Sequence, residues 1–285
     1  MNLSWEKLSL RPEVPFRISR SVQERAERVW ARVERDGVEG WGEADPSPYY
    51  GESAESVSDA LERMRPVLAS EPDPDHLEAI EGRLLETVPG NGSAHAAVSA
   101  ALHDLFGKRA GMPVWQLLGL DPEAAPPSSF TIGIDEPAAM AERARAMSGW
   151  PILKIKLGTE RDREMIEAIR AADDSRRLQV DANAAWTPAE AIENIQMLAE
   201  LGVEMVEQPL PPGDPTAWKQ VRDNSPIPIY ADESCIHASD VPGLAGLVDG
   251  VNIKLAKCGG IREALRAVHT ARACGLEVMF GCMLE

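Results

Sequence analysis

Residues 152–158 read ILKIKLG, a run of branched aliphatic residues that carries Lys154 and Lys156 two positions apart. In a β-strand, residues i and i+2 point to the same side, so both ammonium groups share one face while Ile155 takes the other. A solvated edge strand is the ordinary explanation for a lone Lys-x-Lys pair. The neighbouring segments decide whether that explanation holds.

Short apolar runs of the same kind recur from residue 128 to the end of the chain and alternate with helical segments. The expected strands cover residues 128–133, 152–158, 177–183, 203–209, 228–234, 250–256 and 277–283. Apolar strands separated by helical crossovers indicate a parallel sheet, and the steady repeat favours an α/β fold of the (β/α)8 TIM-barrel type. A Rossmann-type domain is disfavoured because no glycine-rich fingerprint follows the first strand.

The N-terminal part has a different pattern. Residues 27–34 roughly alternate, Asp36 and Gly37 supply a turn, and residues 38–44 predict a return strand. Helical segments are expected at 53–69, 75–88 and 93–110. We therefore expect an α+β capping domain over residues 1–125 and a barrel domain over residues 126–285. The loop at 45–52, which contains Tyr50, is expected either to cover the site and contact substrate or to be an ordinary connection.

Composition excludes several classes of function. Lys and Arg number 29 against 46 Asp and Glu, and the net charge of −17 repels nucleic acid and anionic membranes. No apolar leader or long apolar run is visible, and the four cysteines form no CxxC pair. We expect a cytoplasmic protein that acts on a small molecule rather than on nucleic acid or membrane.

Five consecutive barrel strands carry a charged residue at or near the C-terminal end. These residues are Lys156, Asp181, Glu207, Asp232 and Lys254, separated by 25, 26, 25 and 22 positions. Barrel enzymes place their catalytic groups on this rim, and one charge per βα unit at one height is difficult to explain by solvation. In an eight-stranded barrel, the strands of the two lysines are opposed, and the three carboxylates line one arc between them.

Three carboxylates without histidine or cysteine form a hard, all-oxygen donor set. Asp181, Glu207 and Asp232 are thus expected to bind Mg²⁺, or alternatively Mn²⁺. Without a cation, three anions this close would repel each other and take up protons. Asn183, on the same strand face as Asp181, is expected either to contact the substrate or to cap a turn.

Opposed lysines beside a divalent cation suit proton transfer at a carbon next to a carboxylate. The cation stabilises the enediolate formed when the α-proton leaves, one lysine removes the proton, and the other returns it on the opposite face. We assign Lys156 and Lys254 to these roles. Lys154 adds a like charge that disfavours protonation of Lys156. Lys257 is the rival of Lys254, but it has the wrong parity if the strand continues.

Several motifs together resemble those of the enolase superfamily, in its muconate-lactonising subgroup. They are KIK at 154–156, VDANAAW at 180–186, VEQPL at 206–210, ADES at 231–234 and NIKLAKCGG at 252–260. Within that subgroup, SFTIGID at 129–135, PILKIKLGT at 151–159 and GCMLE at 281–285 are most similar to dipeptide epimerases of the L-Ala-D/L-Glu type. A lysine base paired with Mg²⁺ is a known pattern of the superfamily.

The resemblance implies a Mg²⁺-dependent epimerase of dipeptides and supports the metal and lysine roles given above. It also implies that Glu233 is a carboxylate behind the metal ligands, and that the segment from Arg17 to Glu24 is a lid. Arg20 is the candidate for meeting a substrate carboxylate, and Thr131 is expected to contact substrate. A homo-oligomer is also implied, without independent support from the sequence.

The chain departs from the family after the seventh predicted strand. It ends at Glu285, before the family's eighth strand and its Asp-x-Asp element, so we expect a barrel with seven strands and an incomplete C-terminus. The same site also serves o-succinylbenzoate synthase and muconate cycloisomerase. An inactive ligand-binding fragment is a further alternative. A Schiff-base aldolase is less consistent, because it would not need the carboxylates.

Overall fold

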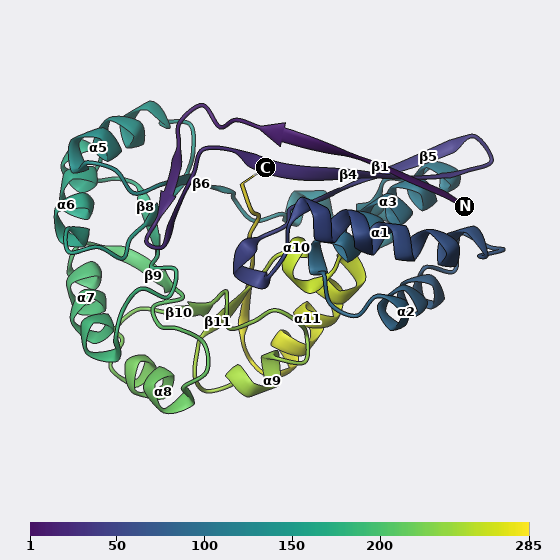
Figure 1. The fold of residues 1–285 in the computed structure, drawn as a ribbon. Coiled ribbons are helices and arrows are strands. Elements are labelled where there is room, and N and C mark those ends of the chain that lie inside the picture. The colour runs from purple at the N-terminus through teal and green to yellow at the C-terminus, as the bar shows by residue number, and fades with distance from the viewer. Residues whose placement is uncertain (285) are drawn as a thin grey trace.

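The computed structural model describes residues 1–284. The N-terminal cap contains an antiparallel sheet of β1 (Asn2–Leu10), β4 (Ala26–Arg35) and β5 (Val38–Ala44), in the order β1-β4-β5 (Figure 1). The predicted β4–β5 meander is confirmed. Strand β1 was not predicted because Leu3 is its one buried residue, so its sequence has no clear alternation.

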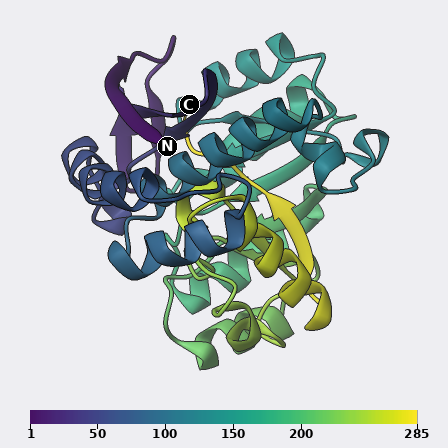
Figure 2. The same ribbon diagram turned by 90° about the vertical axis from the view of Figure 1, so that its right-hand side faces the viewer.

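Three helices cover one face of the cap sheet. They are α1 (Ala54–Ala69), α2 (Leu77–Thr87) and α3 (Gly92–Ala110), and all three confirm the predicted segments. Short α4 (Val114–Leu117) and two 3₁₀ turns, Pro48–Tyr50 and Pro122–Ala124, complete this part. The second view shows the cap helices lying beside the C-terminal helices of the barrel (Figure 2).

A parallel sheet of seven strands follows, counted over the described residues, and it curls with its helices on the outside (Figure 1). Its strands, in the order β12-β11-β10-β9-β8-β7-β6, are β6 (Ser129–Ile132), β7 (Ile152–Lys156), β8 (Arg177–Asp181), β9 (Val203–Glu207), β10 (Ile229–Ala231), β11 (Gly250–Ile253) and β12 (Glu277–Phe280). The crossover helices are α5 (Pro137–Ala146), α6 (Asp162–Ala172), α7 (Pro188–Glu200), α8 (Pro215–Asp223), α9 (Val241–Leu244), α10 (Leu255–Cys258) and α11 (Ile261–Ala273).

All seven predicted strands exist, but most end earlier than expected. The strand predicted for 250–256 ends at Ile253, and Lys254 is the N-cap of helix α10. The parity argument against Lys257 therefore does not apply, because that residue lies on a helix. The register places Lys156, Asp181 and Glu207 side by side at one height, as the spacing predicted.

Two separate hydrophobic cores stabilise the molecule. One joins the cap sheet to helices α1–α3, and the other lies between the parallel sheet and its outer helices. A short hairpin of β2 (Phe16–Ile18) and β3 (Ser21–Gln23) leaves the cap and reaches the barrel, and it is drawn in purple without labels (Figure 1). Among the described helices, none has the length and apolar character needed to cross a membrane.

Candidate active site

Three buried carboxylates meet at the C-terminal ends of neighbouring strands. Asp181 ends β8, Glu207 ends β9, and Asp232 directly follows β10. One oxygen from each lies within 4.8 Å of the others, and all three side chains are almost fully buried. The hard oxygen donors and their convergence fit a small divalent cation such as Mg²⁺.

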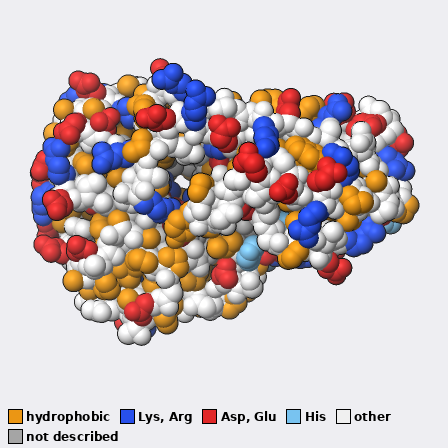
Figure 3. Space-filling model, in the orientation of Figure 1, with side chains coloured by type: hydrophobic (Ala, Val, Ile, Leu, Met, Phe, Trp, Pro, Cys, Tyr) orange, Lys and Arg blue, Asp and Glu red, His pale blue; other side chains and the backbone are white. Residues whose placement is uncertain are grey.

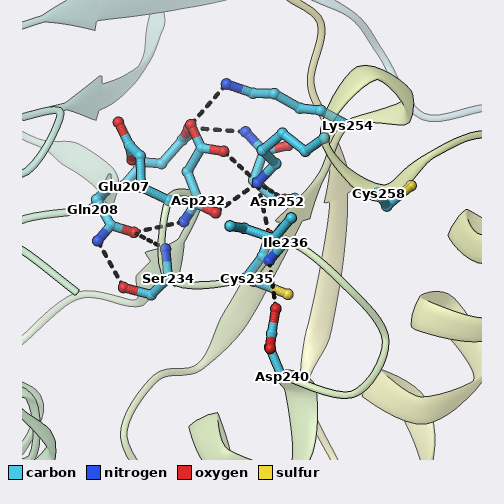
Figure 4. Close-up of polar contacts among 12 residues, drawn as sticks. Glu207, Gln208, Asp232, Ser234, Cys235, Ile236, Asp240, Asn252, Lys254 and Cys258 are labelled. Atoms are coloured by element: carbon cyan, nitrogen blue, oxygen red, sulfur yellow. Dashed lines mark hydrogen bonds and ion pairs between the residues drawn. The ribbon is translucent and has the colours of Figure 1, made fainter. Parts of the chain in front are cut away.

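Neutral side chains hold these carboxylates in place. Asn252 donates from Nδ2 to Glu207 Oε1 at 2.8 Å, and Gln208 Oε1 accepts from the backbone N–H of Asp232 at 2.8 Å and of Ser234 at 3.2 Å (Figure 4). Sequence reasoning missed Asn252 and Gln208. The available signal for Asn252 was its position two residues before Lys254. Gln208 has a φ of 39°, which no pattern predicted.

The predicted lysines surround the carboxylates. Lys154 Nζ lies 2.6 Å from Glu207 Oε2 and 3.2 Å from Asp181 Oδ2. Lys156 Nζ lies 2.6 Å from Asp181 Oδ2, and Lys254 Nζ lies 2.7 Å from Asp232 Oδ2. Lys156 ends strand β7, and Lys254 directly follows strand β11. Three strands of the sheet separate β7 from β11. Two lysines thus reach the carboxylates from different sides.

Lys257 is also buried, but its ammonium group is committed to structural contacts. Nζ donates to the Asp232 carbonyl at 2.5 Å, to Asp232 Oδ1 at 2.6 Å, to the Cys235 carbonyl at 2.8 Å and to the Asn252 carbonyl at 3.0 Å. An ammonium group has three N–H donors, so these acceptors occupy all of them. Lys257 therefore holds the loop after β10, whereas among the described residues Lys254 Nζ has a single hydrogen-bond acceptor, Asp232 Oδ2.

Electrostatics differ among the buried groups. Burial lowers the pKa of Lys156, and the nearby Lys154 and Lys254 charges lower it further while Asp181 opposes them. Burial is thus a larger cause than the neighbouring Lys154 that the sequence singled out. For Lys254, burial is outweighed by the Asp232, Glu207 and Asp181 carboxylates, which raise its pKa. Burial also raises the pKa of Glu207, with the Asp181 charge as the next cause.

A cavity of about 460 Å³ opens beside this cluster, between the barrel and the cap, where the space-filling view shows the surface hollowed (Figure 3). It is lined by Ser19, Arg20, Tyr49, Gly158, Asn183, Ala184, Ala185 and Pro211. The predicted substrate contacts Arg20 and Asn183 are therefore on the cavity wall. Tyr49, not Tyr50, lines it among the loop tyrosines, and the Arg20 guanidinium lies 4.3 Å from the Tyr49 ring centre.

The remaining predicted residues lie near the site without lining this cavity. Thr131 on β6 pairs in register with Lys154 on β7. Tyr50 is half-buried, and this burial raises the pKa of its phenol, which the Asp232 and Glu233 charges raise further. Glu233 Oε1 accepts from Arg20 Nη2 at 2.7 Å and from Asn183 Nδ2 at 3.1 Å. The carboxylate of Glu233 thus connects the hairpin β2–β3 with the barrel.

Comparison with known proteins matches both halves of the chain. Residues 7–119 match the N-terminal domain of mandelate racemase and muconate lactonizing enzyme, and residues 136–285 match the enolase C-terminal domain-like family. An L-Ala-D/L-Glu epimerase from Bacteroides thetaiotaomicron is 43% identical over 90% of this chain and 67% of that protein.

Solved structures of relatives share the fold. A dipeptide epimerase from Enterococcus faecalis V583, solved with Mg and L-Leu-L-Tyr, is 35% identical with a TM-score of 0.93, covering 99% of this chain and 82% of that one. A muconate lactonizing enzyme from Pseudomonas fluorescens, complexed with muconolactone, is 31% identical with a TM-score of 0.94, covering 100% and 80%. The chain belongs to the mandelate racemase and muconate lactonizing enzyme family of the enolase superfamily.

Proposed function

We propose that this chain is a Mg²⁺-dependent dipeptide epimerase that inverts the α-carbon next to the free carboxylate of its substrate. The observation that carries the proposal is the pair of buried lysines, Lys156 and Lys254, on different sides of a carboxylate cluster. The named activities of the B. thetaiotaomicron and E. faecalis relatives favour this substrate class. The proposed enzyme is an isomerase.

Asp181, Glu207 and Asp232 would hold the Mg²⁺, and Mn²⁺ suits the same oxygen donors. When bound, the cation supplies positive charge that stabilises the electrons left on the substrate carboxylate as the α-proton leaves. Lys154 is ion-paired with Glu207 and Asp181. Its charge disfavours a second ammonium group at Lys156 and so helps keep that residue a base.

The two lysines divide the proton transfer. The Lys156 lone pair takes the α-proton, the Cα–H bond breaks, and its electron pair remains in the substrate. The Lys254 ammonium then gives a proton to the opposite face of the planar carbon, which inverts the centre. In the reverse direction the two residues exchange roles. The lowered pKa of Lys156 and the raised pKa of Lys254 agree with this starting arrangement.

Substrate contacts are proposed on the cavity wall. Arg20 and Asn183 line it, which supports their assignment. Thr131 and Tyr50 are retained as proposed contacts because Thr131 shares a strand height with Lys154 and Tyr50 lies near Asp232. We assign Glu233 to supporting Asn183 and Arg20 rather than to binding metal, since its Oε1 contacts both of them.

The finer architecture is likewise a proposal. A division into a cap over 1–125 and a catalytic domain over 126–285 is supported by the two separate hydrophobic cores. We propose that the curled sheet is seven strands of a (β/α)8-type barrel, from its parallel order and outer helices. A small dipeptide as the partner, rather than nucleic acid, agrees with the net charge of −17. A cytoplasmic location is proposed from the sequence alone, and a homo-oligomer is proposed from the family resemblance.

The test is α-proton exchange in D₂O, followed by NMR, on L,L dipeptides including Ala-Glu. We expect exchange with inversion in the presence of Mg²⁺ and its loss with EDTA. Cycloisomerase chemistry is the second candidate, because the P. fluorescens relative shares the fold and binds muconolactone. A folded, Mg²⁺-loaded sample that exchanges no dipeptide proton but converts a muconate or succinylbenzoate-type substrate would replace the proposal, and a sample that binds such ligands without turnover would support an inactive fragment.

A further inference from the structure

The hairpin β2–β3 touches the barrel at the ends of the strands that carry the site. Ser19 Oγ donates to the Ala182 carbonyl at 3.3 Å, and Arg20 Nη1 donates to the Asn183 carbonyl at 2.7 Å. Gly158 makes this approach possible, because a Cβ there would lie 2.7 Å from Ser19 Cβ. Gly158 also has a φ of +107°, a conformation that disfavours other residues. The absence of a side chain at Gly158 therefore leaves the space that the hairpin tip occupies.

Arg20 begins a chain of hydrogen bonds that ends at one catalytic lysine. Its Nη2 donates to Glu233 Oε1 at 2.7 Å, and the same oxygen accepts from Asn183 Nδ2 at 3.1 Å. Asn183 Oδ1 in turn accepts from Lys156 Nζ at 3.0 Å. The Glu233 side chain is 1% exposed, whereas that of Arg20 is 33% exposed. A partly exposed lid residue thus orients a buried network.

The network fixes the direction in which Lys156 can accept a proton. A neutral lysine has two N–H donors and one lone pair. Asp181 Oδ2 and Asn183 Oδ1 are acceptors for the two N–H groups. The lone pair is then left with one direction. Glu233 keeps the side-chain oxygen Oδ1 of Asn183 turned toward Lys156, because Glu233 Oε1 accepts a hydrogen bond from Asn183 Nδ2 at the other end of the same amide.

Lys254 is positioned without the hairpin. Its Nζ donates to Asp232 Oδ2 at 2.7 Å, and Asp232 is held in turn by Lys257 and Gln208. The hydrogen bonds of the hairpin tip instead go to Ala182, Asn183 and Glu233. The two bases therefore depend on different parts of the molecule.

We propose that Arg20 is a positioning residue that latches the hairpin β2–β3 and, through Glu233 and Asn183, aligns Lys156 but not Lys254. The inference rests on the proposed function for its kinetic consequence and on geometry alone for the latch. Arg20 would have this positioning role in addition to its place on the cavity wall. Closure of the hairpin then prepares one face of the site for proton removal.

The first test separates the two faces. In a Lys254→Ala background, α-proton exchange depends on Lys156, and in a Lys156→Ala background it depends on Lys254. We expect Arg20→Ala to slow the Lys156-dependent exchange by about tenfold or more, the usual effect of losing a group behind a catalytic residue, and to change the Lys254-dependent exchange by less than about twofold. Ala-Leu and Ala-Glu, each with both configurations of the second residue, serve as probes.

Arg17→Ala is the matched control, because it removes an exposed arginine from the same hairpin and should leave both exchange rates unchanged. If Arg20 acts as a substrate contact alone, Arg20→Ala raises KM for Ala-Glu, spares Ala-Leu and affects both faces alike. That pattern would overturn the latch. An equal loss on both faces with both dipeptides would also overturn it.

A second readout does not require turnover. We expect Arg20→Ala and Glu233→Gln to shift the NMR resonance of Lys156 Nζ and to speed amide exchange in residues 16–23, whereas Arg17→Ala does neither. If the wild-type protein exchanges no dipeptide proton, the proposed function fails, and this resonance alone decides the latch. An unchanged Lys156 resonance in Arg20→Ala would refute the latch even in an active enzyme.

Discussion

Two of the contacts between the cap and the barrel differ in character. At one, the tip of hairpin β2–β3 makes polar contacts with Asn183 and Glu233 through the partly exposed Arg20. At the other, helix α3 packs against α10 and α11, with the backbone of Gly260 set against Ser99. The first contact serves the wall that holds Lys156, and the second lies behind the wall that holds Lys254.

The difference has a consequence for the proposed catalysis by two opposed lysines. Residues 16–23 contribute no side chain to either hydrophobic core, so we expect the hairpin tip to open at low free-energy cost. Helix α3 instead meets α10 and α11 through close backbone packing, and the Ile261 N–H donates to Ser99 Oγ at 3.1 Å, so we expect this contact to stay closed. The Lys254 wall is permanently assembled by Asp232, Lys257 and Asn252. In the proposed mechanism, the side of the site that holds Lys156 is completed by the hairpin when it closes. A binding site can thus admit substrate on one side while the other stays rigid.

The largest expected effect comes from removing either base. Lys156→Ala and Lys254→Ala should each reduce epimerisation by at least about 10³-fold, since each removes the one acid or base on its face. Each variant should still exchange the α-proton of one stereoisomer with solvent deuterium. NMR in D₂O with both stereoisomers measures this. If both variants exchange both isomers, the assignment of one lysine to each face is wrong.

The next effect concerns the permanent wall and distinguishes Lys257 from Lys254. Lys257→Met should lower the free energy of unfolding by about 3–5 kcal/mol, because it leaves the buried Asp232 Oδ1 and three backbone carbonyls, those of Asp232, Cys235 and Asn252, without this donor. Lys254→Met should cost less, about 1–3 kcal/mol, because Asp232 keeps Lys257 as a partner. Urea unfolding measures both values. Equal losses in the two variants would contradict the structural role given to Lys257.

The two cap contacts can be disturbed separately at their glycines. Gly260 has a φ of +120°, and a Cβ there would lie 2.3 Å from Ser99 Cβ, so Gly260→Ala should destabilise the whole protein by about 2–3 kcal/mol. Gly158→Ala should in addition displace the hairpin, because its Cβ would meet Ser19. Amide exchange of residues 16–23 should therefore rise in Gly158→Ala and stay near the wild-type value in Gly260→Ala. The reverse pattern would show that the hairpin is held elsewhere.

The sequence was sufficient where buried patterns repeat, and insufficient where contacts are exposed or irregular. The βα repeat fixed the height of Lys156, Asp181 and Glu207, because parallel strands in register bring equivalent positions together. Strand β1 and the three-residue strands of the hairpin bury too few side chains to give a periodic signal. A contact such as Arg20 with Glu233 joins residues 213 positions apart, and no local pattern encodes it.

The role of Lys257 was hidden for a related reason. A lysine on a short helix is usually solvated, and its burial here depends on carbonyls from the loop after β10 and from strand β11, which meet in the folded state. The choice between Tyr49 and Tyr50 was also a matter of geometry, because both lie in one 3₁₀ turn and their rings pack edge to face at 5.1 Å. The sequence shows which residues are present, but it does not show in which direction their side chains point.

The smallest expected effect is a pH dependence at the permanent cap contact. The carboxylate of Glu81, on α2, lies with Oε2 3.7 Å from Arg262 Nε and Oε1 3.7 Å from His103 Nδ1. Burial raises its pKa to about 7, above the usual 4.5, while Ser99 and Arg266 oppose the rise. The folded protein therefore holds this proton more tightly than the unfolded chain. Its contribution to stability is full below about pH 4.5 and is lost as the pH rises through about 7.

Replacement of Glu81 with Gln should remove that loss. The free energy of unfolding of Glu81→Gln, relative to wild type, should rise by about 1–2 kcal/mol between about pH 5 and pH 8, less than the full pKa shift because solvent partly screens the carboxylate. Burial lowers the pKa of His103, which acts in the opposite direction but is common to both proteins and largely cancels in the difference. Glu78→Gln, at an exposed carboxylate that pairs with the same Arg262, should show no such slope. A flat difference for Glu81→Gln would mean that water reaches this junction, and the contrast between a closed α3 contact and a movable hairpin would then be weaker than the burial of Glu81 indicates.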